Sequence, residues 1–330
     1  MTTLYIAEQG TYVRKTSDRL RVTRRDEVLA EVPCLHLERV AVFGNVQFST
    51  QSLVELLDHG ISLSLFTRRG RYRGRLVAPL SGGAELRLRQ AEVARTPELS
   101  GEFSAAIVRA KILNTAALLS RYRRNHPAAI TARAVDAIES AARDLNGAMS
   151  LDALRGVEGS AAAKAFACYG AMFREPFRFE GRSRRPPTDP VNALLSFGYM
   201  LLVAELEGLI EGHGLDPYVG FFHQLRHGRS SLALDVLEGL RAPLVDRAVS
   251  SACNLTVVTP EDFEGDAAQG VRLRKDGLKR FLAHFESTMT TEVAHDDGAR
   301  TPRQTMRAQV ERLARWLRDG TPYEPYRFPC

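Results

Sequence analysis

Between Gly220 and Arg241 the chain places one histidine and two acids in largely apolar sequence. The segment is GFFHQLRHGRSSLALDVLEGLR, in which His223 ends an apolar run and Asp235 and Glu238 follow. The two acids are three residues apart, so on a helix they share one face. Carboxylates in such surroundings are costly to bury unless something pairs with them. One imidazole and a carboxylate pair are what a divalent-metal site needs.

A third ligand must come from elsewhere, and Glu158 is the candidate. It is the one acid of the segment LRGVEGSAAA, residues 154–163. Gly156 and Gly159 each weaken a helix by about 1 kcal/mol relative to alanine. A helix that keeps two glycines beside a carboxylate often needs close approach by another group.

Taken singly, each of these residues has a simpler interpretation. Glu158 and the two later acids could be solvated surface side chains, and His223 a satisfied core histidine. Taken together, a set of carboxylate and imidazole donors suits Mg²⁺ or Mn²⁺ better than structural zinc, which prefers thiolates. Such an ion can polarise a phosphoryl oxygen and lower the pKa of a bound water or hydroxyl.

Arginines form a second group of candidate functional residues. Residues 68–75 read RRGRYRGR, with five arginines in eight positions. On a strand, Arg69, Arg71, Arg73 and Arg75 would share one face at a spacing of about 6.6–6.8 Å, which suits a phosphate backbone. The alternative is a solvated edge strand that its charges protect from pairing.

Further arginines lie in the helical half of the chain. Arg182, Arg184 and Arg185 belong to the proline-stopped loop EGRSRRPP, residues 180–187, and another basic cluster lies at residues 121–124. Clusters distributed over both halves indicate a long polyanion as partner, because one small phosphate does not need three of them.

Composition sets wider bounds. The 330 residues are 44% hydrophobic and 25% charged, with a formal net charge of +6, as in an ordinary soluble protein with room for two domains. The four cysteines are far apart and form no CxxC pair, so we expect a reduced, cytoplasmic protein with neither zinc ribbon nor disulfide framework. We expect no signal peptide and no membrane span. Walker A, GxSxG, HExxH and helix-opening GxGxxG patterns are missing from the sequence.

The predicted fold class is α+β, with a small N-terminal β-rich domain followed by a larger all-α domain. Residues 1–78 form the first domain, residues 79–83 a linker and residues 84–330 the second. The predicted strands are Thr3–Ala7, Arg19–Thr23, Val28–Val32, Arg39–Phe43 and Ile61–Phe66, with one helix starting at a capping box at Ser52. The predicted later helices are Ala84–Arg95, Phe103–Arg123, Ala128–Leu145, Leu151–Phe173, Pro190–Glu211, Leu232–Ser250, Gly277–Met289 and Pro302–Arg318.

Three further local features follow from the pattern. Pro243 should kink or split the helix predicted over Leu232–Ser250. The acidic stretch Thr259–Gly270 is expected to be a mobile connection. The tail Pro322–Cys330 is expected to be extended, either as a docking arm or as a frayed terminus.

These residues resemble a known family, the CRISPR-associated integrase and endonuclease Cas1, over essentially the whole length. The most specific stretches are residues 154–159 (LRGVEG), residues 189–199 (DPVNALLSFGY) and the Gly220–Arg241 segment. Their order and spacing match the family as well as their composition. The fold that the resemblance implies is the β domain followed by a helical catalytic domain.

The resemblance assigns roles to the candidate site. It implies that Glu158, His223 and Glu238 are catalytic metal ligands for Mg²⁺ or Mn²⁺ and that Asp235 orients the site. Arg241 falls where some members carry a lysine near the metal, and is expected to contact a DNA phosphate. Many members also have a tyrosine near the reacting phosphate, but this chain has Leu201, Leu202 and Val203 there.

The mechanism implied has no protein nucleophile. The 3′-hydroxyl of a short captured DNA attacks a phosphodiester at the boundary of a CRISPR repeat, and water in its place would give a nuclease. The implied partners are double-stranded DNA (prespacer and CRISPR repeat), a second copy of the chain, Cas2 bridging a dimer of dimers, and in some systems Cas4. The residues alone leave two other functions open, a non-catalytic DNA-binding scaffold and a small-molecule phosphoesterase.

Overall fold

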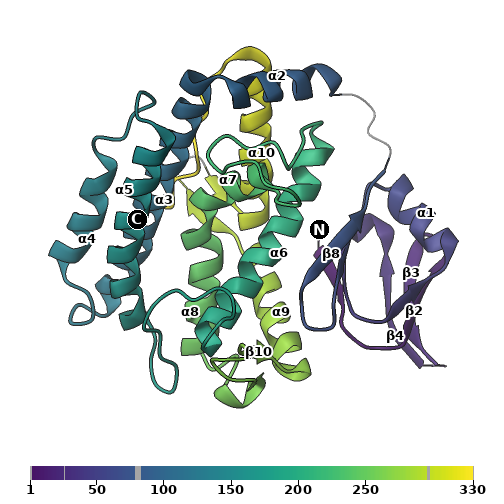
Figure 1. Ribbon diagram of the computed structural model, residues 1–330. Helices are drawn as coiled ribbons and strands as arrows, with labels where there is room; N and C mark the ends of the chain where they lie inside the picture. The colour runs from purple at the N-terminus through teal and green to yellow at the C-terminus, as the bar shows by residue number, and fades with distance from the viewer. Residues whose placement is uncertain (1, 26, 79–82, 296–297, 330) are drawn as a thin grey trace.

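The computed structural model describes residues 2–25, 27–78, 83–295 and 298–329. Its N-terminal part is rich in strands, which form two four-stranded sheets of order β1-β5-β7-β8 and β4-β3-β2-β6. Figure 1 shows this strand-rich part beside the helices. The strands are β1 (Thr2–Ile6), β2 (Thr11–Thr16), β3 (Arg19–Arg24), β4 (Glu27–Pro33), β5 (Leu37–Phe43), β6 (Val46–Phe48), β7 (Ser62–Phe66) and β8 (Tyr72–Leu76).

Apolar side chains from both sheets pack with helix α1 (Thr50–Asp58) to form the core of the strand-rich part. Val40 of β5 and Leu56 of α1 are completely buried there. The hydroxyl of Ser49 accepts a hydrogen bond from the Ser52 N–H and caps the helix. The helix therefore begins earlier than the predicted cap at Ser52, because Ser49 satisfies the free N–H groups of the first turn.

The strands predicted from apolar runs are present as β1, β3, β4, β5 and β7. Strands β2 and β6 were not predicted. In β2, Val13 is completely buried whereas Arg14 and Lys15 are exposed. Such a strand is formed by its ladder partners, β3 on one side and β6 on the other, and pairing of this kind leaves little trace in local composition.

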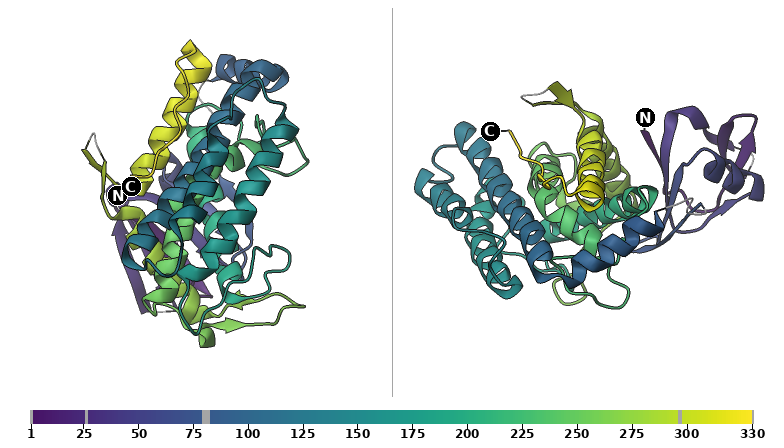
Figure 2. Two further views of the ribbon diagram at one scale, coloured as in Figure 1. Left: turned by 90° about the vertical axis from the view of Figure 1, so that its left-hand side faces the viewer. Right: turned by 90° about the horizontal axis from the view of Figure 1, so that it is seen from above.

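Helices make up most of the chain after residue 83. Figure 2 shows α3 and α5 running side by side in both views. The helices are α2 (Ala84–Arg95), α3 (Pro97–Asn125), α4 (Ala132–Glu139), α5 (Leu151–Tyr169), α6 (Pro190–Gly212), α7 (Ser231–Leu240), α8 (Arg247–Asn254), α9 (Lys275–Thr290) and α10 (Pro302–Asp319). Of the predicted linker at 79–83, residues 79–82 lie outside the described residues.

The helical part is not all-α as predicted, because it carries two short antiparallel hairpins. Strand β9 (Phe263–Glu264) pairs with β10 (Arg272–Leu273), and β11 (Val293–His295) pairs with β12 (Gly298–Arg300). The first hairpin lies within and beside the stretch expected to be a mobile connection. A buried Phe263 and the Arg272–Glu264 ion pair hold it in place, and these pairings join residues too far apart for a local pattern to indicate.

Pro243 divides the helix predicted over Leu232–Ser250, as expected. Between α7 and α8 the backbone forms a π-helical turn, Arg241–Asp246. A proline has no N–H to donate and its ring crowds the preceding turn, so the helix widens there instead of continuing.

Among the described residues, two helices are long and apolar enough to cross a membrane by length and composition alone. They are α3 and α6, and 67% and 72% of their most apolar windows are buried inside the protein. Both are therefore central core helices of this fold. The three described cysteines, Cys34, Cys168 and Cys253, are free, and Cys330 lies outside the described residues.

Ion pairs join the strand-rich part to α6. Arg75 of β8 pairs with Glu207 and Glu211, and the Tyr72 hydroxyl donates to Glu207 at 3.0 Å. Nearby, Arg39 of β5 pairs with Glu205 at 2.9 Å. Because these groups are buried, each charge depends on its partner. The two parts of the chain are therefore held in one relative position.

Replacing Arg75 with alanine should destabilise the protein by about 3 kcal/mol, because it leaves the buried Glu207 carboxylate without its cation. Urea unfolding at neutral pH would measure this loss. The matched control is Arg73→Ala, an exposed arginine on the same strand, which should change stability by less than about 0.5 kcal/mol. Equal losses in the two variants would contradict the buried ion pair.

Candidate metal centre

Glu158 lies in the middle of α5, the helix capped by Ser150. Gly156 and Gly159 flank it, and a Cβ added at either position would meet no described atom within 4 Å. The sequence suggested that the glycines allow close approach by another group, but no described group within this chain packs closely against them. Both glycines border open space on α5.

His223 is held in a fixed orientation by the Asp235 carboxylate. Asp235 is completely buried on α7, and its Oδ1 accepts from the His223 Nδ1 at 2.6 Å and from the His223 N–H at 2.9 Å. Because a carboxylate only accepts, Nδ1 carries the proton and the Nε2 lone pair remains available to a ligand.

The same carboxylate also holds the chain segment before His223. Its Oδ2 accepts from the N–H groups of Phe221 at 2.6 Å and Phe222 at 3.0 Å. Gly220 is needed for this approach, because a Cβ there would lie 2.7 Å from both Asp235 Oδ2 and the Ser231 backbone. These contacts suit the orienting role predicted for Asp235.

Glu238 lies one turn beyond Asp235 and its side chain is only 5% exposed. Its Oε1 is 2.8 Å from the Arg241 Nη2 and 3.6 Å from the His223 Nε2. Burial acts to raise the pKa of Glu238, but the nearby charges of Arg241 and Lys111 outweigh it. The pKa of this carboxyl group therefore lies well below its ordinary value.

Sequence reasoning missed Lys111, a residue of α3 at the centre of the site. Its ammonium contacts Glu158 Oε1 and lies 2.7 Å from Glu238 Oε2. Between the buried Ala110 and Ile112, it is a cation on a core helix. A charged residue between buried apolar neighbours was the available signal, and it does not reveal which acids the charge meets.

Two of the three predicted ligands, Glu158 and Glu238, meet at the Lys111 ammonium, and His223 Nε2 lies 3.6 Å from Glu238 Oε1. Among the residues that the structure describes, no three His, Cys, Asp or Glu side chains are close enough to hold an ion. The Lys111 ammonium already binds both carboxylates, with its nitrogen 2.7 Å from the buried Glu238 Oε2. Carboxylate oxygens and an imidazole nitrogen are donor types that a hard divalent cation accepts.

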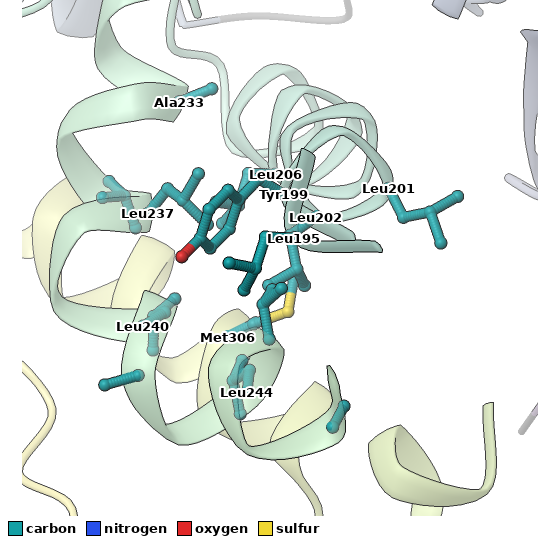
Figure 3. Close-up of a cluster of buried hydrophobic side chains, with 14 of the residues drawn as sticks. Leu195, Tyr199, Leu201, Leu202, Leu206, Ala233, Leu237, Leu240, Leu244 and Met306 are labelled. Atoms are coloured by element: carbon teal, nitrogen blue, oxygen red, sulfur yellow. The ribbon is translucent and has the colours of Figure 1, made fainter. Parts of the chain in front are cut away.

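Tyr199 is committed to a structural role. Its hydroxyl donates to Asp246 Oδ1, and its ring packs among the leucines of α6 and α7, as Figure 3 shows. The Arg241 guanidinium carbon lies 4.6 Å from the centre of this ring. Arg241 thus occupies a closed position between Tyr199 and Glu238, where it neutralises the carboxylate instead of facing solvent.

The predicted arginine face is only partly formed. Phe66 pairs with Tyr72 and Leu65 with Gly74, so Arg73 is an extra residue in a bulge. The bulge breaks the alternation that would have aligned Arg73 with Arg75. The Arg75 side chain points inward and pairs with Glu207 and Glu211 of α6. Arg75 is therefore not part of the predicted DNA-binding face.

Other predicted arginines do converge, although they come from distant segments. They line a pocket of about 580 Å³ that Arg241 and Tyr199 also border. Arg182 is partly buried and donates to Asn192 Oδ1 and Ser196 Oγ, which fixes the loop, and burial lowers its pKa. The exposed members of the pocket include Arg69, Arg71, Arg184 and Arg185.

Asp235→Ala should destabilise the protein by about 3–5 kcal/mol, since several buried donors lose a charged acceptor together. Asp235→Asn should cost less, because an amide oxygen can still accept. Urea unfolding measures both. The control is Asp266→Ala, which removes an exposed carboxylate that also accepts from two backbone N–H groups; a comparable loss there would rule out a special role for Asp235.

Comparison with known proteins gives a consistent assignment. The family described as CRISPR associated protein Cas1 matches residues 4–287. A CRISPR-associated endonuclease Cas1 of Rhodospirillum rubrum is 37% identical over 306 residues, covering 89% of this chain and 88% of the relative. Another from Thermus thermophilus is 34% identical over 328 residues, covering 98% and 96%.

Solved structures share the fold at lower identity. A Cas1 protein from Thermotoga maritima superposes with a TM-score of 0.81 at 23% identity, over 97% of each chain. A casposase bound to integration product gives 0.84 at 22% identity, over 100% of this chain and 96% of that one. With the family match over most of its length, the chain belongs to the Cas1 family of CRISPR-associated proteins.

Proposed function

We propose that this protein is a metal-dependent DNA endonuclease and integrase that inserts short DNA fragments into a CRISPR array. The observation that carries the proposal is that Glu158 and Glu238 share one cation, the Lys111 ammonium, while His223 Nε2 lies 3.6 Å from Glu238 Oε1. This cluster lies next to a pocket lined by arginines, with Arg241 contacting both. The relatives are named endonucleases, and a structural neighbour is a casposase bound to integration product.

Each residue of the centre has a task that follows from its contacts. Glu158, His223 through Nε2, and Glu238 would hold Mg²⁺ or Mn²⁺. When bound, the ion would stabilise the charge that develops on the phosphoryl oxygens and help to activate the attacking 3′-hydroxyl or water. Asp235 keeps the imidazole in the required tautomer, and Arg241 limits the repulsion between Glu238 and the substrate phosphate.

The arginine pocket would bind the DNA backbone. Its exposed guanidinium groups come from the turn before β8 and from the 180–187 loop, so one strand of phosphates can contact both segments of the chain. A single small phosphate would not need a surface of this extent.

The partners are proposed from the relatives. We propose that the protein acts in the cytoplasm as a homodimer, bridged by Cas2 into a dimer of dimers, on prespacer and CRISPR-repeat DNA. A Cas6-RT-Cas1–Cas2 complex contains a chain that superposes with a TM-score of 0.81. A relative from Geobacter sulfurreducens, 34% identical, is a fusion of the Cas4 exonuclease with Cas1, which favours Cas4 as a further partner.

Substituting a proposed ligand should abolish the chemistry. Glu158→Gln or His223→Ala should lower integration of a short duplex into repeat DNA by more than about 100-fold in Mn²⁺. The assay measures strand-transfer product on a gel, with EDTA as a second way to remove the ion. Glu311→Gln, an exposed glutamate on α10, is the control and should retain activity. Undiminished product after substitution or chelation would favour a non-catalytic DNA-binding scaffold.

The exposed arginines of the pocket should determine how DNA affinity responds to salt. The double variant Arg184→Ala/Arg185→Ala should reduce the slope of log affinity against log salt by about 2, one for each lost phosphate contact. Fluorescence anisotropy with a labelled duplex measures this slope. Arg73→Ala, outside the pocket lining, should leave it nearly unchanged. Binding by the parent protein that does not respond to salt would instead favour a small phosphoester substrate.

A further inference from the structure

We propose that Lys111 acts as a built-in counter-cation that holds the metal ligands together in the metal-free protein and releases them when a divalent ion binds. The inference rests on the proposed function, because it concerns the same metal centre. It adds a residue to that centre and states what the residue does before the ion arrives. The consequence is that Lys111 lowers the affinity of the protein for its metal.

The contacts of Lys111 are with two of the proposed ligands at once. The ammonium binds Glu158 of α5 and Glu238 of α7 from a third helix, α3. Its side chain is 16% exposed, compared with 22% for Glu158 and 5% for Glu238. A single positive group thus joins three helices at the point where their charges meet.

The carboxylates need such a cation when no metal is present. The Arg241 guanidinium pairs with Oε1 of Glu238, and the Lys111 ammonium pairs with Oε2. Without Lys111, Glu238 Oε2 and Glu158 would face each other as like charges at a largely buried site, which is strongly unfavourable. Lys111 therefore stabilises the ligand arrangement and keeps it ready for binding.

The ammonium cannot share these oxygens with a divalent ion. It donates hydrogen bonds and has no lone pair, so it is not a ligand. A divalent cation at the same oxygens would also repel it strongly at that short distance. Lysine suits displacement because its charge sits on a flexible stem, and partial exposure gives the ammonium a route towards solvent.

The test is the affinity for Mn²⁺ alone, measured by isothermal titration calorimetry on the full chain without DNA. Lys111→Met keeps most of the side-chain volume and removes the charge. It should lower the dissociation constant about tenfold, since the ion no longer has to break an ion pair. Without metal the variant should melt at a lower temperature than the parent protein, and Mn²⁺ should raise its melting temperature by more.

Two further variants test whether a change in Mn²⁺ affinity comes from loss of the Lys111 charge. Lys111→Gln is neutral and polar, and it should tighten Mn²⁺ binding in the same direction even where methionine disturbs folding. Lys164→Met removes an exposed lysine six residues after Glu158 on α5, and it should leave the affinity unchanged. That control separates displacement of Lys111 from a general effect of net charge.

The possible outcomes distinguish this inference from the proposed function. If both Lys111 variants bind Mn²⁺ as weakly as the parent protein or more weakly, while Glu158→Gln still reduces binding, the counter-cation role is overturned and the metal centre stands. If Glu158→Gln and His223→Ala bind Mn²⁺ as the parent protein does, the metal centre itself is overturned, and this inference with it.

Discussion

The site depends on one buried carboxylate. Asp235 accepts hydrogen bonds from the N–H groups of three successive residues and from the imidazole of the third, His223. This fixes an irregular segment whose backbone groups would otherwise be buried without partners. It also fixes the ring of His223 on the side of Glu238. Loop geometry and ligand orientation therefore have the same physical cause, and neither can change without the other.

Charge balance is the second constraint. Glu238 is almost fully buried, yet it contacts Arg241 and Lys111, and these two cations make an ionised carboxylate tolerable in the interior. The same logic operates at the joint between the two parts of the chain, where Arg75 and Arg39 meet glutamates of α6. Helix α6 carries the negative side of that joint, and its other faces pack against α7 in the core. The position of the β-rich part is thus connected to the metal centre through one helix.

The sequence predicts what depends on local pattern. Apolar runs located most strands, helical periodicity located the long helices, and Pro243 marked the break after α7. Glu158 and Glu238 meet at Lys111 and His223 lies next to Glu238, whereas spacing alone left open which acid of α7 faced the centre. What escaped prediction depends on long-range pairing. Strand β2 exists because of its neighbours, and a bulge at Arg73 separated arginines that simple alternation had aligned. Lys111 contacts its two acids because helices α3, α5 and α7 converge. A short stretch of sequence contains no information about that convergence.

The π-helical turn after α7 has a geometric consequence for the site. In an α-helix, residues five positions apart point in directions that differ by about 140°. The wider turn closes with one more residue, and here Arg241 stacks on the Tyr199 ring while Asp246 accepts from the Tyr199 hydroxyl. The Tyr199 side chain thereby contacts both ends of this turn, Arg241 through its ring and Asp246 through its hydroxyl. The spacing between the arginine and the aspartate is set by the size of a phenol, so the chain cannot be shortened there without moving the cation away from Glu238.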